Sequence, residues 1–383
     1  MPFGAKKREC AATAEHLEAV EWAKGLKGSA AWAIEDINKQ LELDPAAAMR
    51  ACPERKKIWE EALDTVPAPS AGQRAWGAAC SGAVEPDCKL SLVIVEPRKH
   101  PWMRSVLHNV ARVYGGSGAH LYIFHGTLNL KFVEEIIQGW TGVQLRCVGK
   151  DNFSIFDYDA LLTSPSFYDS FDTSHCLIFQ TDVLLRRRVP SKFFEYDYVA
   201  APWAKLPPAD YVNGNPVYLH DGRKCVGNGG FSLRSVAAMR DICTKYNWEG
   251  TAKERFAQVP KDASGAPLNP SIQEGLPRSY FVDEDCFISA RTPFDRLPHN
   301  HEAQEFSVEN LWHSNPCGLH KPWPSGLAGD RWYSSEELRW LLSAVSGTPA
   351  SGHGGVRADP QPYEVKNLAL QDGAEMWAMV PTT

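Results

Sequence analysis

The order of apolar and helical segments after residue 88 restricts the possible folds of this chain more than any other feature. Four segments, KLSLVIVE, HLYIFHG, VQLRCVG and CLIFQTD, have the composition of buried strands, and WMRSVLHNVARVY and KFVEEIIQGW have apolar residues at helical spacing. Strands that alternate with helices predict βαβ units, a parallel sheet and right-handed crossovers. The predicted fold class is therefore α/β, with a sheet flanked by helices.

The sequence on either side predicts three regions. Residues 13–64 are rich in Ala, Glu, Lys and Leu at helical spacing, and residues 65–88 have the Pro, Gly and Ser content of a linker. We predict a helical N-terminal extension and linker over residues 1–88, a main domain over residues 89–345 and a C-terminal tail over residues 346–383. The extension either recruits a partner or packs on the main domain.

Charge, hydropathy and cysteine spacing exclude several functions. The net charge of -6 gives no overall positive field for nucleic acid. No run approaches the roughly 18 to 20 apolar residues that span a bilayer, and the first residues lack the apolar segment of a secretory signal, so we predict no transmembrane segment and a cytoplasmic location. The ten cysteines form no CxxC pair, which argues against a zinc knuckle or a disulfide scaffold and predicts mostly reduced thiols.

Polar side chains follow the first and the fourth predicted strands, at the edge where open α/β sheets bind ligands. Glu96 and Arg98 follow the first strand, and period 2 places Gln180 and Asp182 on one side of the chain after the fourth, with Thr181 between them. An amide oxygen and a carboxylate at this spacing can share Mg²⁺ or Mn²⁺ with nucleotide phosphates. The alternatives are solvated loop charges at the first strand and a turn cap at the fourth.

Two further segments have features of a sugar site. In KFFEYDYVAAPW, Asp197 can accept hydrogen bonds from sugar hydroxyls and Trp203 can stack on a sugar ring, although both also suit a protein core. In CVGNGGFSLRS, glycines allow a ligand close to the backbone or simply make a tight strand-to-helix turn, and we expect a helix containing Ser232–Arg234 after them. This segment contributes Gly227, Asn228, Gly229 and Gly230.

An acidic step lies further along the chain. Asp283, Glu284 and Asp285 stand together before an apolar segment. Acidic residues in a first helical turn stabilise the helix, which is the structural interpretation. Neighbouring acids also raise one another's pKa, which is what a general base requires.

A histidine-rich stretch is the last candidate region. No pair in it matches HExxH, which weakens a zinc-hydrolase interpretation. A single histidine, such as His320, could complete a metal site begun by Asp182, while Lys321 neutralises a phosphate. The stretch contains His299, His301, His313 and His320, followed by Lys321 and Trp323.

Taken in order, these motifs resemble an uncharacterised family of glycosyltransferase-like domains over residues 90–323. The motifs are VEPR, IFHG, FQTD, YDYVAAPW, VGNGGFSLR, DEDCF and GLHKPW. The resemblance implies a GT-A fold, a Rossmann-like mixed sheet flanked by helices, in which an Asp-x-Asp motif follows a central strand. QTD stands in its place here, with Asp182 matching the second acid and Gln180 replacing the first.

GLHKPW is similar to the HxxGxxKPW signature of glycogenin-like transferases, whose His binds the metal and whose Lys contacts the diphosphate. Lys321 matches this Lys, but Asn315 stands at the His position, which leaves His320 or His313 as the metal ligand beside Asp182. DEDCF resembles the acidic pair that supplies the base in several inverting transferases. That likeness implies Asp285 or Glu284 as the catalytic base.

The resemblance implies a hexosyl- or pentosyltransferase assisted by Mn²⁺ or Mg²⁺. It would move a sugar from a nucleotide-diphosphate sugar to a hydroxyl of a glycan, a protein or a small molecule. The donor nucleotide is then assigned to Glu96, Arg98, Gln180, Thr181, Asp182 and Lys321, and the sugar or acceptor to Asp197, Trp203, the Gly227–Gly230 segment and Trp323.

Two other functions fit part of the pattern. Gln180 in place of the first acid would suit a binding module of the same fold, which recognises a nucleotide or glycan without turnover. The histidine stretch would suit a metal-dependent hydrolase, provided that at least two of its four histidines bind zinc.

Overall fold

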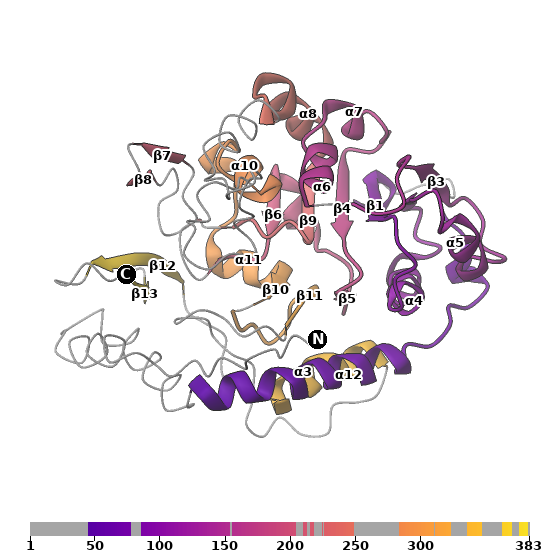
Figure 1. Ribbon diagram of the computed structural model, residues 1–383, viewed down its shortest axis with the longest axis horizontal. Coiled ribbons are helices and arrows are strands. Elements are labelled where there is room, and N and C mark those ends of the chain that lie inside the picture. Colours follow the sequence, from indigo (N-terminus) through magenta and orange to yellow (C-terminus); the bar gives the residue numbers. More distant parts are fainter. Residues whose placement is uncertain are drawn as a thin grey trace, which may run out of the picture.

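The computed structural model describes residues 45–77, 86–153, 155–203, 210–212, 215–217, 224, 226–248, 283–309, 311–322, 335–346, 362–369 and 375–381. At its centre is a six-stranded sheet with the strand order β3-β2-β1-β4-β9-β6 (Figure 1). Its strands are β1 (Leu90–Glu96), β2 (His120–His125), β3 (Gln144–Cys147), β4 (His175–Phe179), β6 (Tyr198–Ala200) and β9 (Phe231–Ser235).

The central sheet is mixed. Strands β1 to β4 are parallel, as the alternation of strands and helices predicts, and β9 is antiparallel to both β4 and β6. The carboxyl ends of β1, β2 and β4 therefore meet the start of β9 at one edge of the sheet. The predicted α/β fold with a mixed sheet is confirmed, while a purely parallel sheet is wrong.

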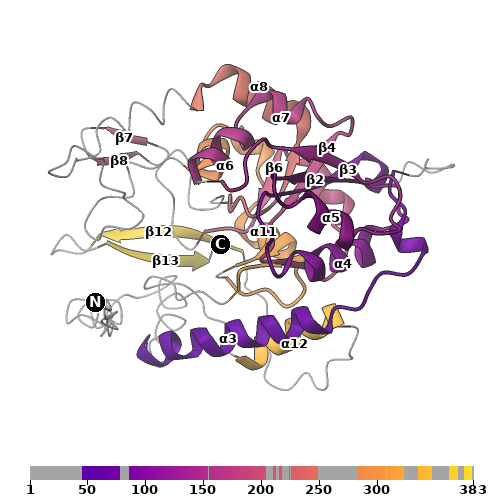
Figure 2. The ribbon, with the colours of Figure 1, turned by 45° about the vertical axis from the view of Figure 1, so that its right-hand side comes forward.

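Helices cover both faces of the sheet (Figure 2). Leu92 and Ile94 of β1 belong to one apolar cluster with helix α4, whereas Val93 and Val95 belong to a second cluster on the opposite face. All residues of β1 are buried, as expected for a strand covered on both sides. The helices are α4 (Met103–Tyr114), α5 (Leu130–Ile136), α6 (Ile155–Leu162), α7 (Pro165–Tyr168), α8 (Val236–Lys245), α10 (Glu284–Ser289) and α11 (Asn300–Phe306).

Smaller elements complete the described chain. A three-stranded sheet has the order β10-β11-β5, and two hairpins join β7 to β8 and β12 to β13. The strands are β5 (Val183–Leu185), β7 (Asp210–Val212), β8 (Asn215–Val217), β10 (Ser307–Val308), β11 (Gly318–His320), β12 (Tyr363–Ala369) and β13 (Glu375–Pro381). Short 3-10 helices are η1 (Gly72–Arg74), η2 (Pro86–Lys89), η3 (Ser191–Glu195) and η5 (Phe294–Arg296).

The described part of the predicted N-terminal extension packs on the main domain. Helix α3 (Pro45–Thr65) lies along α12 (Ser335–Ser346) in both views, and Trp59 and Leu341 share the larger apolar cluster (Figures 1 and 2). The segment after α3 is also held in place, because the Trp76 backbone N–H donates to the Thr141 carbonyl at 3.0 Å. The helices predicted before residue 45 lie outside the described residues.

The helix expected over Ser232–Arg234 is wrong, because these residues lie in β9. Phe231 and Leu233 pair with Phe179 and Leu177 of β4, so the segment is held between two strands in the middle of the sheet. Helix α8 begins only at Val236, where the Ser235 hydroxyl accepts a hydrogen bond from the Ala238 backbone.

None of the described helices combines the length and the apolar character needed to cross a membrane. Of the cysteines whose side chains are described, Cys88 is disulfide-bonded, whereas the sequence predicts that most of the cysteines are reduced. The others are free thiols, namely Cys147, Cys176, Cys243, Cys286 and Cys317.

Candidate functional site

The pairing of β5 with β11 brings two distant predicted motifs together. His320 of β11 lies opposite Val183 of β5, and the Lys321 backbone N–H donates to the Asp182 carbonyl at 3.0 Å. Asp182, His320 and Lys321 are thus neighbours at the carboxyl edge of β4. The sequence predicts that Asp182 and Lys321 share a site, and the structure places the two residues side by side.

The position of β5 is fixed from its other side by Asn109 of α4. The Asn109 amide donates to the Leu185 carbonyl at 2.9 Å and accepts from the Leu185 N–H at 2.7 Å. Asn109 is 1% exposed, so water cannot reach the Leu185 backbone here, and the Asn109 amide satisfies its N–H and its carbonyl instead. This clamp holds the strand that begins directly after Asp182.

The half-buried Asp182 and the buried His320 form a polar pair. Asp182 Oδ1 lies 3.5 Å from His320 Nε2, which is longer than a normal hydrogen bond, and neither atom has another hydrogen-bond partner. Burial opposes the charged form of Asp182, but His320 and Lys321 outweigh it and lower the pKa of this carboxyl. Burial opposes the charged imidazole as well, but Asp182 and Glu309 raise the pKa of His320.

This pair fits a divalent cation. Two atoms that bind one ion at about 2.1 Å lie roughly 3 to 4 Å apart, close to the separation between Asp182 Oδ1 and His320 Nε2. Both atoms are buried and lack a hydrogen-bond partner, which is costly unless a ligand completes the site. The carboxylate oxygen suits Mn²⁺ or Mg²⁺, whereas the imidazole nitrogen favours a transition metal, so of these two ions the pair fits Mn²⁺ better, with phosphate oxygens or water filling the remaining positions. Of the two histidines predicted as ligands, His320 is the one beside Asp182.

Lys321 has a strained backbone. Its φ is 44°, and it is the one non-glycine residue with positive φ in the described part of the chain. The left-handed region costs such a residue about 1–2 kcal/mol. Strain of this kind concentrates at functional sites, where the surrounding contacts maintain it. Here the hydrogen bond to Asp182 fixes the backbone of Lys321 while its side chain is exposed.

Arg98 lies near this pair, after β1. Its guanidinium donates twice to Glu96, with both distances 2.8 Å, and Asp182 contributes to raising the Arg98 pKa after the larger effect of Glu96. Glu96 is buried, so it orients the exposed Arg98 and leaves that side chain to face a ligand. The Asn129 amide holds the loop by donating to the carbonyls of both residues.

The glycine turn, residues Gly227–Gly230, lies between Trp203 and the Asp182–His320 pair and has no room for side chains. A Cβ on Gly227 would lie 2.2 Å from the Trp203 ring, and one on Gly230 would lie 2.2 Å from His320 Nε2 and 2.8 Å from Gln180 Oε1. The Gln180 backbone N–H also donates to the Gly230 carbonyl at 3.0 Å. A larger residue at Gly227 or Gly230 would clash, because the Trp203, His320 and Gln180 side chains approach the backbone here.

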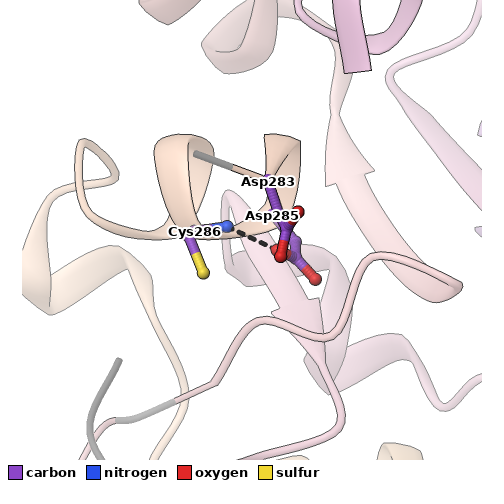
Figure 3. Close-up of side chains that lie close together, drawn as sticks. All are labelled: Asp283, Asp285 and Cys286. Carbon is purple, nitrogen blue, oxygen red and sulfur yellow. Dashed lines mark hydrogen bonds between the residues drawn. The ribbon is translucent and has the colours of Figure 1, made fainter. Parts of the chain in front are cut away.

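The acidic step lies on the other side of this turn. Asp285 Oδ2 accepts the Gly229 N–H at 2.9 Å, while its Oδ1 accepts the Cys286 N–H (Figure 3). Burial, together with Glu284 and Asp283, raises the pKa of Asp285 well above its usual range. Gly229 therefore contacts Asp285, and the next residue, Gly230, contacts His320. The predicted base and the Asp182–His320 pair are thus close neighbours.

Glu284 has a different environment from Asp285. Its Oε1 accepts a hydrogen bond from Arg234 Nη2 at 2.7 Å, and both side chains are buried. Arg234 also donates to Ser232 and to Tyr168. Glu284 is therefore committed to an internal ion pair behind the turn, and Asp285 is the better placed of the two predicted bases.

A cluster of three possible metal ligands occurs at the same helix start. Ligand atoms of Asp283, Asp285 and Cys286 lie within 4.8 Å of one another (Figure 3). Both Asp285 oxygens already accept backbone hydrogen bonds, so we assign no metal to this group. No described group of three such ligands includes a histidine, and the hydrolase alternative gains no support.

Several predicted residues lie elsewhere. Because β6 runs parallel to β4, Asp197, which precedes β6, lies at the opposite edge of the sheet. There it pairs with Arg296 at 2.9 Å. His299 stacks on His301 at the start of α11, and His313 accepts a hydrogen bond from the Asn315 backbone. Trp323 lies outside the described residues.

The arginines after β5 hold the fold together. Arg186 donates to the Leu341 and Ser314 carbonyls, Arg187 pairs with Glu305, and Arg188 pairs with Asp87. The basic run that follows Asp182 is therefore engaged in internal contacts.

Two residues near the site have no assigned role in the sequence analysis, namely the buried Asp159 and the half-buried Glu309. Asp159 of α6 is 2% exposed, and its Oδ2 has no hydrogen-bond partner. Burial and the charges of Glu284, Asp283 and Asp285 raise the pKa of Asp159 to about 10. The one available sequence signal is a charged residue inside an apolar helical segment, IFDYDALL.

Asp159→Asn should stabilise the protein at neutral pH. Between the unfolded pKa near 3.9 and the folded pKa, the unfolded chain releases this proton and the folded chain keeps it, so the stability of the natural protein falls as the pH rises. Asn has no such proton. We expect the free energy of unfolding at pH 7.5 to rise on the order of 2 kcal/mol, and the gain to shrink toward pH 4.5.

Urea unfolding at both pH values measures this difference. Asp169→Asn is the matched control, because Asp169 is exposed and pairs with Arg240 on the surface, and it should change stability by less than about 0.5 kcal/mol. A gain that is equal at the two pH values would contradict the assignment of a buried proton to Asp159.

The fold and the site define an α/β protein with an open mixed sheet and a polar site at the carboxyl edge. A family model described as "Protein of unknown function (DUF5672)" matches residues 142–320, a little under half of the chain. The match includes Asp182, the glycine turn and the acidic step, and it ends at His320. No curated protein matches the chain.

Proposed function

We propose that this chain is a glycosyltransferase that moves a sugar from a nucleotide-diphosphate sugar to an acceptor hydroxyl. The observation that carries the proposal is the convergence of Asp182, His320 and Lys321 beside the Gly229–Gly230 turn, with Asp285 on the other side of that turn. Transfer to a hydroxyl requires a group that binds an anion, a site that binds a cation, and a carboxylate of raised pKa. Lys321, the Asp182–His320 pair and Asp285 would supply these three parts.

Each group has a defined part in the proposal. Asp182 and His320 would hold Mn²⁺ or Mg²⁺, which when bound would neutralise charge on the leaving diphosphate. Lys321 and Arg98 place positive charge toward the same diphosphate. Asp285 takes the proton of the acceptor hydroxyl if the reaction inverts the sugar, and Trp203 offers a ring against which the sugar packs.

The partners follow from this reaction. The donor is a nucleotide-diphosphate sugar, and the acceptor is a glycan, a protein or a small molecule. We propose the cytoplasm as the location. The five free thiols favour it, whereas the disulfide bond of Cys88 disfavours it.

A donor panel tests the proposed function. The purified full chain is incubated with UDP-sugars and GDP-sugars, with Mn²⁺ or with EDTA, and mass spectrometry records nucleotide release and sugar transfer. We expect release with one donor class that depends on Mn²⁺. Nucleotide binding without any turnover would instead identify the binding module. Thermal unfolding detects such binding, because a ligand at 100 times its Kd stabilises the folded state by about 2.7 kcal/mol.

A further inference from the structure

Glu309 lies on the opposite side of the His320 ring from Asp182. Glu309 Oε1 is 3.7 Å from His320 Nδ1, and Asp182 Oδ1 is 3.5 Å from His320 Nε2. Both separations are longer than a normal hydrogen bond, so each ring nitrogen is buried beside a carboxylate without being hydrogen-bonded to it. The ring is 5% exposed, so these two carboxylates are its charged neighbours along both nitrogen directions. An imidazole that binds a metal through one nitrogen carries a proton on the other, and an acceptor for that proton fixes the ring.

Glu309 is itself held by the glycine turn. Its Oε2 accepts a hydrogen bond from the Asn228 amide at 2.6 Å, and Asn228 Oδ1 accepts the Gly230 N–H at 3.0 Å. Gly230 in turn lies against His320, since a Cβ there would lie 2.2 Å from the ring nitrogen. Glu309, Asn228, Gly230 and His320 therefore form one closed set of contacts.

A largely buried carboxylate at this position is costly without a role. The Glu309 side chain is 13% exposed, and burial raises the pKa of its carboxyl even though His320 and Lys321 partly offset the cost of its charge. A neutral amide at position 309 would accept the hydrogen bond from Asn228 equally well, so this contact does not require a charge. The imidazole of His320 is therefore the buried group that a negative charge on Glu309 faces.

We propose that Glu309 is a positioning residue that orients the His320 ring through Nδ1, presents Nε2 toward Asp182 for a divalent cation, and couples this ring to the Asn228–Gly230 turn. The inference rests on the proposed function, since it concerns the same cation pair. It adds a residue outside every predicted motif, and it links the cation pair to the turn that contacts Asp285.

Mn²⁺ affinity tests this role without reference to turnover. The Kd for Mn²⁺ is measured by electron paramagnetic resonance of the free ion, for the natural chain and for Glu309→Gln, in the presence of a nucleoside diphosphate. Loss of a group that orients a ligand weakens metal binding about 10-fold to 100-fold, and we expect this range. Glu305→Gln is the control, because Glu305 lies on the same segment but pairs with Arg187 and Lys192, and its Kd should stay within about twofold.

A second variant keeps the proposal testable if Glu309→Gln does not fold. Asn228→Ala leaves the carboxylate in place and removes the amide that holds it, so we expect a smaller loss of Mn²⁺ affinity, about threefold to 10-fold. An unchanged Kd in both variants would overturn the proposal, as would a natural chain that binds no Mn²⁺. A loss far beyond 100-fold in Glu309→Gln would also overturn it, because Glu309 would then be a ligand itself.

Failure of the proposed function gives a different result. In that case no donor is turned over, yet Mn²⁺ binding still depends on Glu309, and the positioning role stands. Where turnover exists, excess Mn²⁺ should restore kcat of Glu309→Gln to within about threefold, with a raised KM for the metal. Structural damage would lower kcat at every Mn²⁺ concentration.

Discussion

Arg234→Met is expected to lower the free energy of unfolding by about 3–5 kcal/mol. Arg234 is completely buried in β9, and its guanidinium donates to Glu284, Ser232 and Tyr168. Methionine fills much of the space but leaves the Glu284 carboxylate buried without a cation. A buried charge that loses its partner accounts for most of the expected loss. Urea unfolding at pH 7.5 measures it.

The second substitution separates charge from packing. In Arg234→Met with Glu284→Gln no charge remains at this position, so the double variant should be more stable than Arg234→Met by at least about 1 kcal/mol. Arg240→Met is the matched control, since the exposed Arg240 pairs with Asp169 and should cost less than about 1 kcal/mol. An Arg234→Met variant as stable as this control would show that the buried pair adds nothing to the fold.

Most of the central sheet could be predicted because its signals are local. The apolar runs of β1, β2 and β4 and the helical spacing of α4 are visible within single segments, and the structure places each within a few residues of the prediction. Residues 231–235 show the limit of this approach. Their apolar residues alternate as in a strand, but the glycines before them suggest a strand-to-helix turn, and only pairing with β4 decides between the two.

The candidate site depends more on long-range pairing. The proximity of Asp182 to His320, rather than to His313, follows from the register between β5 and β11, which no local pattern reveals. Asp197 shows the converse, because its chemistry suits a sugar but the direction of β6 places it at the other edge of the sheet. Glu309 has no recognisable motif, and its meaning comes from contacts with Asn228 and His320.

Asp182→Asn is expected to reduce kcat by at least about 10²–10³-fold with any donor that the natural chain turns over. Asparagine keeps the shape of Asp182 and its backbone contact with Lys321, but it removes the negative charge that faces His320. A neutral amide oxygen is a weaker ligand for a hard divalent cation than a carboxylate. The Kd for Mn²⁺ should therefore rise in parallel with the loss of kcat.

Asp172→Asn provides the control at the opposite end of β4. Asp172 precedes that strand, is exposed, and lies 3.4 Å from the Tyr122 hydroxyl and from His120, so its substitution removes one acid from the same part of the chain without touching the carboxyl edge. Its kcat and Mn²⁺ affinity should stay within about twofold of the natural values. If Asp182→Asn kept more than about a tenth of the natural kcat, then the Asp182 carboxylate could not be the group that holds the cation, and the leaving diphosphate would have to be neutralised by Lys321 and Arg98 alone.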